Sequence, residues 1–337
     1  MLSWKKYMFQ INYLKKMMNE EQKIIKKYFS PIAKNKESLG LINDAAIIYK
    51  KKLVVSTDMM IENQHFDKSY DPKYLAKKLL RVNLSDIAAM GAEPYGYTLN
   101  ISLPKTKHIS WIQRFVIGLR EDNKRFKLKL FGGDISRSSK IFLSATIFGV
   151  IRKKVHDNSL AKEGSQIYVS GFLGDAALGL EIQKKKKIND LINNSTKEYF
   201  LKKLYLPEPQ IELGRSLLGL ADFCTDISDG LEVELSRVCE NSNLQANIYL
   251  SKVPVSNKAK KVFKVLKSKK NDIWDRVLFG GEDYKLLFSV RKEKEGLLIK
   301  KIKNIHKIGF FKKGKGIYFL DEKNKKKNFK NKSFNHF

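Results

Sequence analysis

The stretch RVNLSDIAAMGA, residues 81–92, decides how this chain folds. It closes a run from Pro72 to Met90 in which apolar residues recur at helical spacing, so we predict one long helix that ends at Gly91. Asp86 lies late in this helix, where a carboxylate is unfavourable because that end of a helix carries negative partial charge. A functional ligand explains this position better than a helix cap does, and a solvated surface aspartate is the competing interpretation.

Asp86 belongs to one of five short segments that set carboxylates beside small or hydroxyl residues. Acidic residues are scarce, 35 against 66 basic ones, yet these segments fall where a predicted strand ends or a predicted helix begins. Mg²⁺ and nucleotide phosphates require oxygen ligands of this kind, so the five segments indicate one shared site. They are Asn43-Asp44-Ala45-Ala46, Ser56-Thr57-Asp58, Asn83-Leu84-Ser85-Asp86, Gly132-Gly133-Asp134 and Asp226-Ile227-Ser228-Asp229-Gly230.

Three of these segments also have a plainer interpretation. Ser56-Thr57-Asp58 follows an apolar strand and could supply a helix N-cap. Gly132-Gly133-Asp134 could be an ordinary turn. Asp229 has the capping-box spacing to Glu232 and could simply begin a helix, whereas Asp226 and Ser228 have no such role. The sequence alone leaves these alternatives open.

Strands and helices alternate in two blocks, which predicts an α/β protein with a boundary near residues 151–163. The first block holds strands at 45–49, 53–56, 97–103, 127–131 and 141–151, and helices at 72–90 and 109–126. The second block holds strands at 166–170, 223–227, 247–250 and 284–290, and helices at 174–183, 207–220 and 231–241, with a lysine-rich loop at 184–194.

Composition excludes several classes of protein. No apolar run approaches the roughly 18 residues that cross a bilayer, and lysines interrupt the N-terminus, so we expect a cytoplasmic protein without a membrane partner. Two cysteines, Cys224 and Cys239, make neither a disulfide framework nor a zinc site. The net charge of +31 suggests nucleic acid, but its excess is lysine rather than the arginine that reads phosphates and bases. We therefore expect no specific nucleic-acid partner.

The sequence also lacks the common phosphate-binding motifs. It contains no Gly-x-x-x-x-Gly-Lys-Ser/Thr loop, no Gly-x-Gly-x-x-Gly after a strand, and no protein-kinase motif set. A nucleotide enzyme with this sequence would hold phosphates mainly through Mg²⁺ carried by carboxylates.

Together the acidic segments resemble the thiamine-monophosphate kinase family, within the aminoimidazole-ribotide synthetase-like superfamily. The resemblance runs from about Asn19 to Phe319 and includes the five segments above, the whole of residues 81–92, and two further stretches. These are GFLGDAALGL at residues 171–180 and Gly280-Gly281-Glu282-Asp283-Tyr284.

The resemblance implies a two-domain fold of that superfamily: an N-terminal ATP- and Mg²⁺-binding domain at 18–151, whose sheet pairs in a homodimer, and a C-terminal α/β domain at 152–337. Residues 1–17 match nothing in the family and are expected to lie outside the fold, with Met18 as an alternative start. Several Mg²⁺ ions are implied, and their ligands would be Asp44, Ser56, Thr57, Asp58, Asp86, Asp134, Asp226 and Asp229. ATP would contact Gly133, Asp134, Ser228 and Asn158, and the thiamine substrate would contact His65, Glu282 and Phe329.

This chain departs from the family pattern at a few positions. Asn43 replaces a common aspartate, Asn158 stands where an arginine normally contacts ATP, and Gln210 stands where arginine is common. The aromatic residue near the substrate could be Phe329 or Phe334.

The implied reaction is transfer of the ATP γ-phosphoryl group to thiamine monophosphate. The acceptor phosphate has a pKa near roughly 6, so we expect no catalytic acid or base and an in-line transfer driven by metal ions and positioning. Two alternatives remain open from the sequence: another ATP-dependent enzyme of the superfamily, such as aminoimidazole-ribotide synthetase, and a basic nucleic-acid-binding protein with a degenerate kinase fold.

Overall fold

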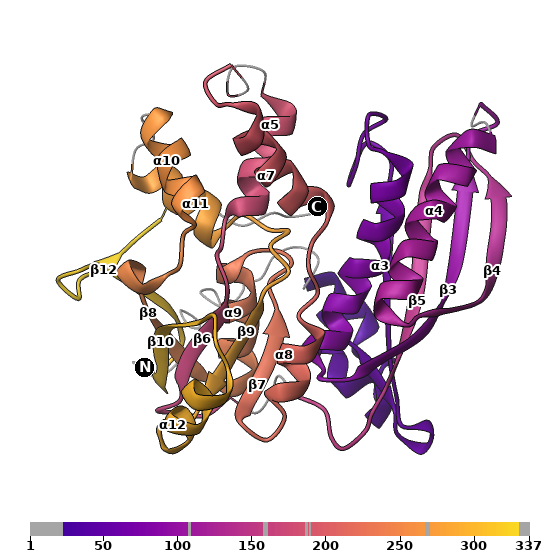
Figure 1. Ribbon diagram of the computed structural model, residues 1–337. Coiled ribbons are helices and arrows are strands. Elements are labelled where there is room, and N and C mark those ends of the chain that lie inside the picture. Colours follow the sequence, from indigo (N-terminus) through magenta and orange to yellow (C-terminus); the bar gives the residue numbers. More distant parts are fainter. Residues whose placement is uncertain are drawn as a thin grey trace.

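The structure is a computed structural model, and it describes residues 23–106, 109–157, 161–185, 188, 190–266 and 270–329. It contains two sheets, one from each half of the chain, and therefore has the predicted α/β character (Figure 1). The proposed extension at 1–17 lies outside the described residues, as do Asn158 and Phe334. None of the helices in the described ranges is both long and apolar enough to cross a bilayer.

The first sheet has five strands in the order β1-β2-β5-β3-β4. Only the β3–β4 pair is parallel. Helices α3 (Pro72–Ala89) and α4 (Ile109–Phe126) pack against each other beside this sheet. The strands are β1 (Ala46–Ile48), β2 (Leu53–Ile61), β3 (Glu93–Leu103), β4 (Lys129–Arg137) and β5 (Phe142–Val150).

The second sheet has seven strands in the order β12-β11-β8-β10-β6-β9-β7. Its strands are β6 (Gln166–Ser170), β7 (Ala221–Asp226), β8 (Leu244–Tyr249), β9 (Leu286–Val290), β10 (Ile305–Lys313), β11 (Gly316–Leu320) and β12 (Lys326–Lys327). Its helices are α5 (Asp175–Lys184), α7 (Asn194–Tyr205), α8 (Ile211–Ser216), α9 (Leu231–Ser242), α10 (Asn257–Val265), α11 (Lys270–Leu278) and α12 (Lys292–Lys301). Short turns of 3₁₀- or π-helix lie at Ile25–Phe29, Lys36–Leu41, Tyr49–Lys51 and Leu250–Lys252.

Helix α3 is the central element of the molecule, and Figure 1 shows it between the two sheets. Asp71 caps its N-terminus by accepting a hydrogen bond from the Lys73 amide, and Pro72 follows as the first helical residue. It packs on β2 and β5 of the first sheet and on β7 and α8 of the second half. Because both flanks are covered, almost all of its C-terminal half is buried, including Asn83 and Ser85.

Two predicted boundaries were wrong in a way that affects the site. Strand β2 does not end at Ser56-Thr57-Asp58 but continues to Ile61, because Met59, Met60 and Ile61 extend its pairing with β5. Strand β4 likewise runs through Gly132-Gly133-Asp134 to Arg137, so that segment is not a turn. Both segments therefore lie inside strands, where successive side chains point to opposite faces.

Candidate functional site

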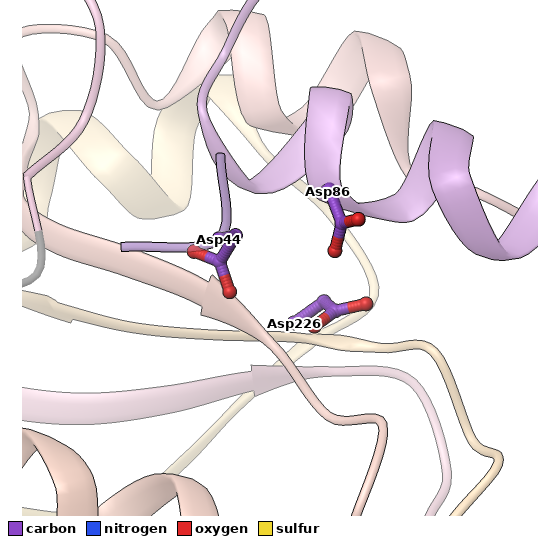
Figure 2. A group of neighbouring side chains, drawn as sticks. All are labelled: Asp44, Asp86 and Asp226. Carbon is purple, nitrogen blue, oxygen red and sulfur yellow. The ribbon is translucent and has the colours of Figure 1, made fainter. Parts of the chain in front are cut away.

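Three carboxylates from distant parts of the chain meet between the sheets. Asp44 comes from the loop before β1, Asp86 from α3 and Asp226 from the end of β7, and Figure 2 shows them turned toward one another. Their ligand oxygens all lie within 4.8 Å of one another. The Thr225 hydroxyl donates to Asp44 Oδ1 over 2.6 Å and so fixes the Asp44 loop against β7. This grouping was predicted from the acidic segments.

Strand β2 adds two side chains to the same side. The Ser56 hydroxyl donates to Asp86 Oδ2 over 2.5 Å, so the Ser56 side chain points toward α3. Asp58 is two residues further along the same strand and therefore points to the same face. Thr57 lies between them and points to the opposite face of the sheet. There its hydroxyl donates to the Ala145 carbonyl over 3.1 Å and accepts from Thr146. The Thr57 side chain is therefore separated from the three carboxylates by the sheet itself.

Burial and mutual repulsion shift the protonation of these acids. Burial, followed by the charges of Asp229 and Glu282, raises the pKa of Asp58 to about 6. Burial also raises the pKa of Asp86 well above its usual range, and nearby carboxylates add to the shift. The pKa of Asp226 rises for the same reasons, with burial first and Asp44 next. Each shift arises first because burial disfavours the charged carboxylate, and then because neighbouring carboxylates repel it.

The donor set fits a hard divalent cation. Mg²⁺ prefers carboxylate and water oxygens in a compact octahedron, and three carboxylates with the Ser56 hydroxyl supply oxygen only. Asp226 Oδ2 is buried and makes no hydrogen bond of normal geometry among the described residues, and the nearby Ser85 hydroxyl lowers the raised Asp226 pKa only in part. A bound cation would satisfy that oxygen and reverse the repulsion within the group.

A cavity of about 740 Å³ opens from this group between the two halves of the molecule. Asp58 and Asp86 line one end of it, and the loop that carries Ser228 and Asp229 lines a second side. Gly281 lets the Gly280-Gly281-Glu282 loop approach that side closely, because a Cβ there would lie 2.4 Å from the Ser228 carbonyl. The cavity is large enough for a small organic molecule and its phosphates.

Two of the three predicted substrate residues line this cavity, namely His65 and Glu282. His65 Nδ1 accepts a hydrogen bond from the Ile61 amide over 2.9 Å, which fixes the ring at the end of β2. Glu282 pairs with Lys78 over 2.5 Å. The third residue, Phe329, packs edge to face on Phe279, a cavity residue, with ring centroids 5.8 Å apart.

Asp229 does not cap helix α9. The N-cap is Gly230, and no side chain caps the helix. Asp229 instead accepts a hydrogen bond from Arg237 over 2.9 Å, and the same guanidinium bonds both oxygens of Glu234 at 3.0 Å. Burial raises the pKa of Glu234 to about 7 even though Arg237 lowers it. The capping interpretation of Asp229 is therefore wrong, and Arg237 holds its carboxylate at the cavity wall.

Gly133 and Asp134 lie apart from this group within one chain. In the sheet, Asp58 pairs with Ala145, Ala145 with Leu99, and Leu99 with Gly133. Three strand spacings, roughly 14 Å, therefore separate Asp58 from Gly133. Asp134 points to the outer face, as Thr57 does, and its amide donates to Asn100 Oδ1 over 3.1 Å. The predicted ligands thus divide between two faces of one sheet.

Sequence reasoning missed Lys78, which is buried and lines the cavity. A signal for it existed: Lys78, Val82 and Asp86 are four residues apart in turn and share one stripe of α3. A lysine on the buried stripe of an apolar helix is unusual enough to be noticed. Tyr70 and Arg276 also line the cavity and were not predicted.

Comparison with known proteins identifies the family of this chain. Residues 42–151 and 162–321 match the N-terminal and C-terminal domains of AIR synthase related proteins. Thiamine-monophosphate kinase of Buchnera aphidicola from Schizaphis graminum is 36% identical, with 95% of this chain and 100% of that protein covered. The enzyme of Escherichia coli K12 is 33% identical, with coverage of 82% and 85%.

Solved structures agree with the sequence comparison. The structure of AaThiL complexed with AMPPCP and TMP superposes with a TM-score of 0.81 at 29% identity, and the match covers 96% of this chain and 98% of the other. On these matches, which span nearly its whole length, the chain belongs to the thiamine-monophosphate kinase family of AIR synthase related proteins.

Proposed function

We propose that this protein transfers the γ-phosphoryl group of ATP to thiamine monophosphate and forms thiamine diphosphate and ADP. The observation that carries the proposal is the carboxylate group of Asp44, Asp86 and Asp226, of which Asp86 lines one end of a cavity between the two halves. Relatives with this name cover nearly the whole chain, and the similar AaThiL structure holds an ATP analogue and TMP.

The residues of the cavity favour a mechanism without a catalytic acid or base. The acceptor phosphate loses its second proton near roughly pH 6, so it is nucleophilic at neutral pH. Asp44, Asp86 and Asp226 would hold Mg²⁺ with Ser56 and Asp58, and Asp229 would hold a further ion. Mg²⁺ would supply the positive charge that offsets repulsion between two polyanions and aligns them in line. The chain itself contributes orientation and exclusion of water.

Gly133, Asp134, Ser228 and Asn158 are proposed to contact ATP, and Thr57 is not retained as a ligand of the ions at Asp44, Asp86 and Asp226, because its side chain lies on the opposite face of the sheet. Ser228 lines the cavity, whereas Asp134 and Thr57 lie on the outer face of the first sheet. ATP would therefore have to reach that face as well, near the edge strand β4.

A homodimer is also part of the proposal. The outer face of the first sheet carries exposed apolar side chains, with Tyr95 at 40%, Phe131 at 46% and Met59 at 54% exposure. Among the described residues no helix covers this face, and in Figure 1 strand β4 lies at the rim of the molecule. A second copy could bury this apolar surface and close the outer side of the Asp134 strand. The proposed location is the cytoplasm.

The direct test is incubation of the protein with ATP, Mg²⁺ and thiamine monophosphate, followed by chromatography of thiamine diphosphate. We expect product that disappears in EDTA and falls by about 10³-fold in Asp58→Asn and Asp134→Asn variants that remain folded. Product at the parental rate in either variant would contradict its proposed role. No product from a folded parent protein would point to another acceptor within the superfamily, and steep salt-dependent RNA or DNA binding without ATP turnover would support the nucleic-acid alternative.

A further inference from the structure

The buried ammonium group of Lys78 lies at the cavity but belongs neither to the carboxylate group nor to the predicted substrate residues. Lys78 lies on the cavity stripe of α3 and is only 2% exposed. Burying an ammonium group is costly unless it is paired. Its contacts among the described residues are Glu282 Oε2 at 2.5 Å and the face of the Tyr70 ring, whose centroid is 5.9 Å away.

Lys78 is the inner cation of a predominantly acidic cavity. Three lysine and arginine side chains among the described residues line that cavity. Arg276 is bound to Glu181 over 2.9 Å, and Lys184 lies at the exposed end of α5. The acids that line the same space include Asp58, Asp86 and Asp229. Lys78 is therefore the basic side chain most shielded from water, where its charge acts most strongly.

The position of Lys78 along α3 places it beyond the metal-binding end. Asp86 is eight residues further on the same stripe, so the two side chains start about 12 Å apart along the helix axis. Asp58, Glu282 and Lys78 all line this cavity, and Lys78 and Glu282 pair directly within it. Lys78, Glu282 and Asp58 thus surround the stretch of cavity between the carboxylate group and the part left for an organic substrate.

The Glu282 end of the ion pair is held by its backbone. Glu282 has a φ of 73° in the left-handed region, and its amide donates to the Ser228 carbonyl over 2.7 Å. Gly280 before it cannot carry a side chain, because a Cβ would lie 2.3 Å from the Arg276 carbonyl. The two halves of the molecule therefore place the Glu282 carboxylate and the Lys78 ammonium side by side in the same space.

We propose that Lys78 is a substrate-binding and specificity-determining residue: it pairs with Glu282 when the cavity is empty and binds the phosphate of the acceptor when substrate enters. A compact ammonium with three N–H donors suits a phosphate. The pair then selects a molecule that carries a cation and an anion close together, the cation toward Glu282 and the phosphate toward Lys78. Thiamine monophosphate, with a ring cation and a phosphate, has this charge pattern, so the inference rests on the proposed function.

The test compares two ligands that differ only in the phosphate. Binding of thiamine monophosphate and of thiamine is measured by calorimetry, with Mg²⁺ and a non-hydrolysable ATP analogue present. In the Lys78→Met variant we expect Kd for thiamine monophosphate to rise about 10- to 100-fold, the loss of one charge-assisted bond. Kd for thiamine should change by less than about threefold. Lys78→Arg should restore most of the phosphate preference, and Glu282→Gln should weaken both ligands.

Lys77→Met is the matched control, because Lys77 is the neighbouring lysine of α3 and pairs with Glu121 over 2.5 Å. It should leave both affinities at the parental values. Unchanged thiamine monophosphate affinity in Lys78→Met overturns the inference, and so does an equal loss for both ligands, which would mean that Lys78 only positions Glu282. A parent protein that neither binds nor phosphorylates thiamine monophosphate removes the proposed function, and this inference with it.

Discussion

At the scale of single residues, the carboxylate group of Asp44, Asp86 and Asp226 destabilises the fold whenever its cation is removed, for example by EDTA. Asp226 is buried beside Asp44 and Asp86, and each raised pKa reports a charged form that the fold disfavours. In Asp226→Asn we expect turnover to fall by about 10³-fold. The same variant in EDTA should unfold at a temperature no lower than the parent, because one of three repelling charges is gone. Turnover assays and thermal denaturation check the two effects, and an earlier unfolding transition in EDTA would contradict the second.

His156 gives the fold a defined acid sensitivity. It is buried, its Nε2 lies 2.9 Å from the Gly214 carbonyl, and burial is the main cause that lowers its pKa from 6.5 to about 4. Between these values the unfolded chain binds a proton that the folded chain does not, so stability falls as pH drops from 6.5 toward 4. The loss is on the order of 3 kcal/mol.

His156→Gln should remove most of this pH dependence in urea unfolding measured between pH 7 and about pH 4. His306→Gln is the comparison, because His306 is only partly buried, although burial lowers its pKa in the same direction. Equal slopes of stability against pH in the parent and the His156 variant would contradict the assignment.

The grouping of Asp44, Asp86 and Asp226 followed from the sequence because each side chain stood beside a predicted element end. The placement of Thr57 did not follow, because the strand was predicted to end at Ser56 and a one-residue step along a continuing strand reverses the face. Lys78 was missed because lysine is normally solvated. Its partner Glu282 is 204 residues away, and only the tertiary fold brings the two together.

At the scale of elements, the packing of strand β4 against β3 requires glycine at position 133 more strictly than at position 132. A Cβ on Gly133 would lie 1.8 Å from the Leu99 carbonyl, whereas a Cβ on Gly132 meets nothing within 4 Å. Both residues have positive φ, 154° and 150°, so alanine strains the backbone at either one by about 1–3 kcal/mol.

We expect Gly133→Ala to cost about 3 kcal/mol more than Gly132→Ala because it must also separate β4 from β3. Chemical denaturation of the two variants measures the difference directly. Equal free energies of unfolding for the two variants would contradict this prediction, because they would mean that β3 and β4 can separate at Gly133 without a loss of stability.

The elements with clear periodicity were predicted well. Helix α3 was expected at 72–90 and spans Pro72–Ala89, and α4 has the predicted bounds. The single helix expected at 207–220 is instead the short α8, Ile211–Ser216, with α7 lying before the Pro207-x-Pro209 entry. Helix α7 was not predicted, because its run of polar residues and lysines resembles the loop before it. Tertiary packing of Phe200 and Leu204 holds it in place.

At the scale of the whole molecule, the uncovered face of the first sheet predicts self-association. Phe131→Glu places a charge among Tyr95 and Phe148, whose rings lie 5.3 and 5.8 Å from the Phe131 ring. We expect this variant to elute as a monomer in size exclusion with light scattering and to lose activity, since Asp134 lies on the same face. Leu297→Glu on α12 is the control, because Leu297 has the same 46% exposure elsewhere. A parent protein that is already monomeric would contradict the proposed dimer.

Helix α3 lies between the two sheets, and one continuous apolar cluster includes Leu80 of α3, Leu143 of the first sheet and Phe288 of the second. The two family domains therefore share a core even though their sequences divide between residues 151 and 162. Because the two domains share a core, unfolding of one domain destabilises the other. We therefore expect heat to unfold the protein in a single cooperative step, with equal calorimetric and van't Hoff enthalpies. The N-terminal half expressed alone should be unable to form a stable globule, because α3 would expose its second flank to water.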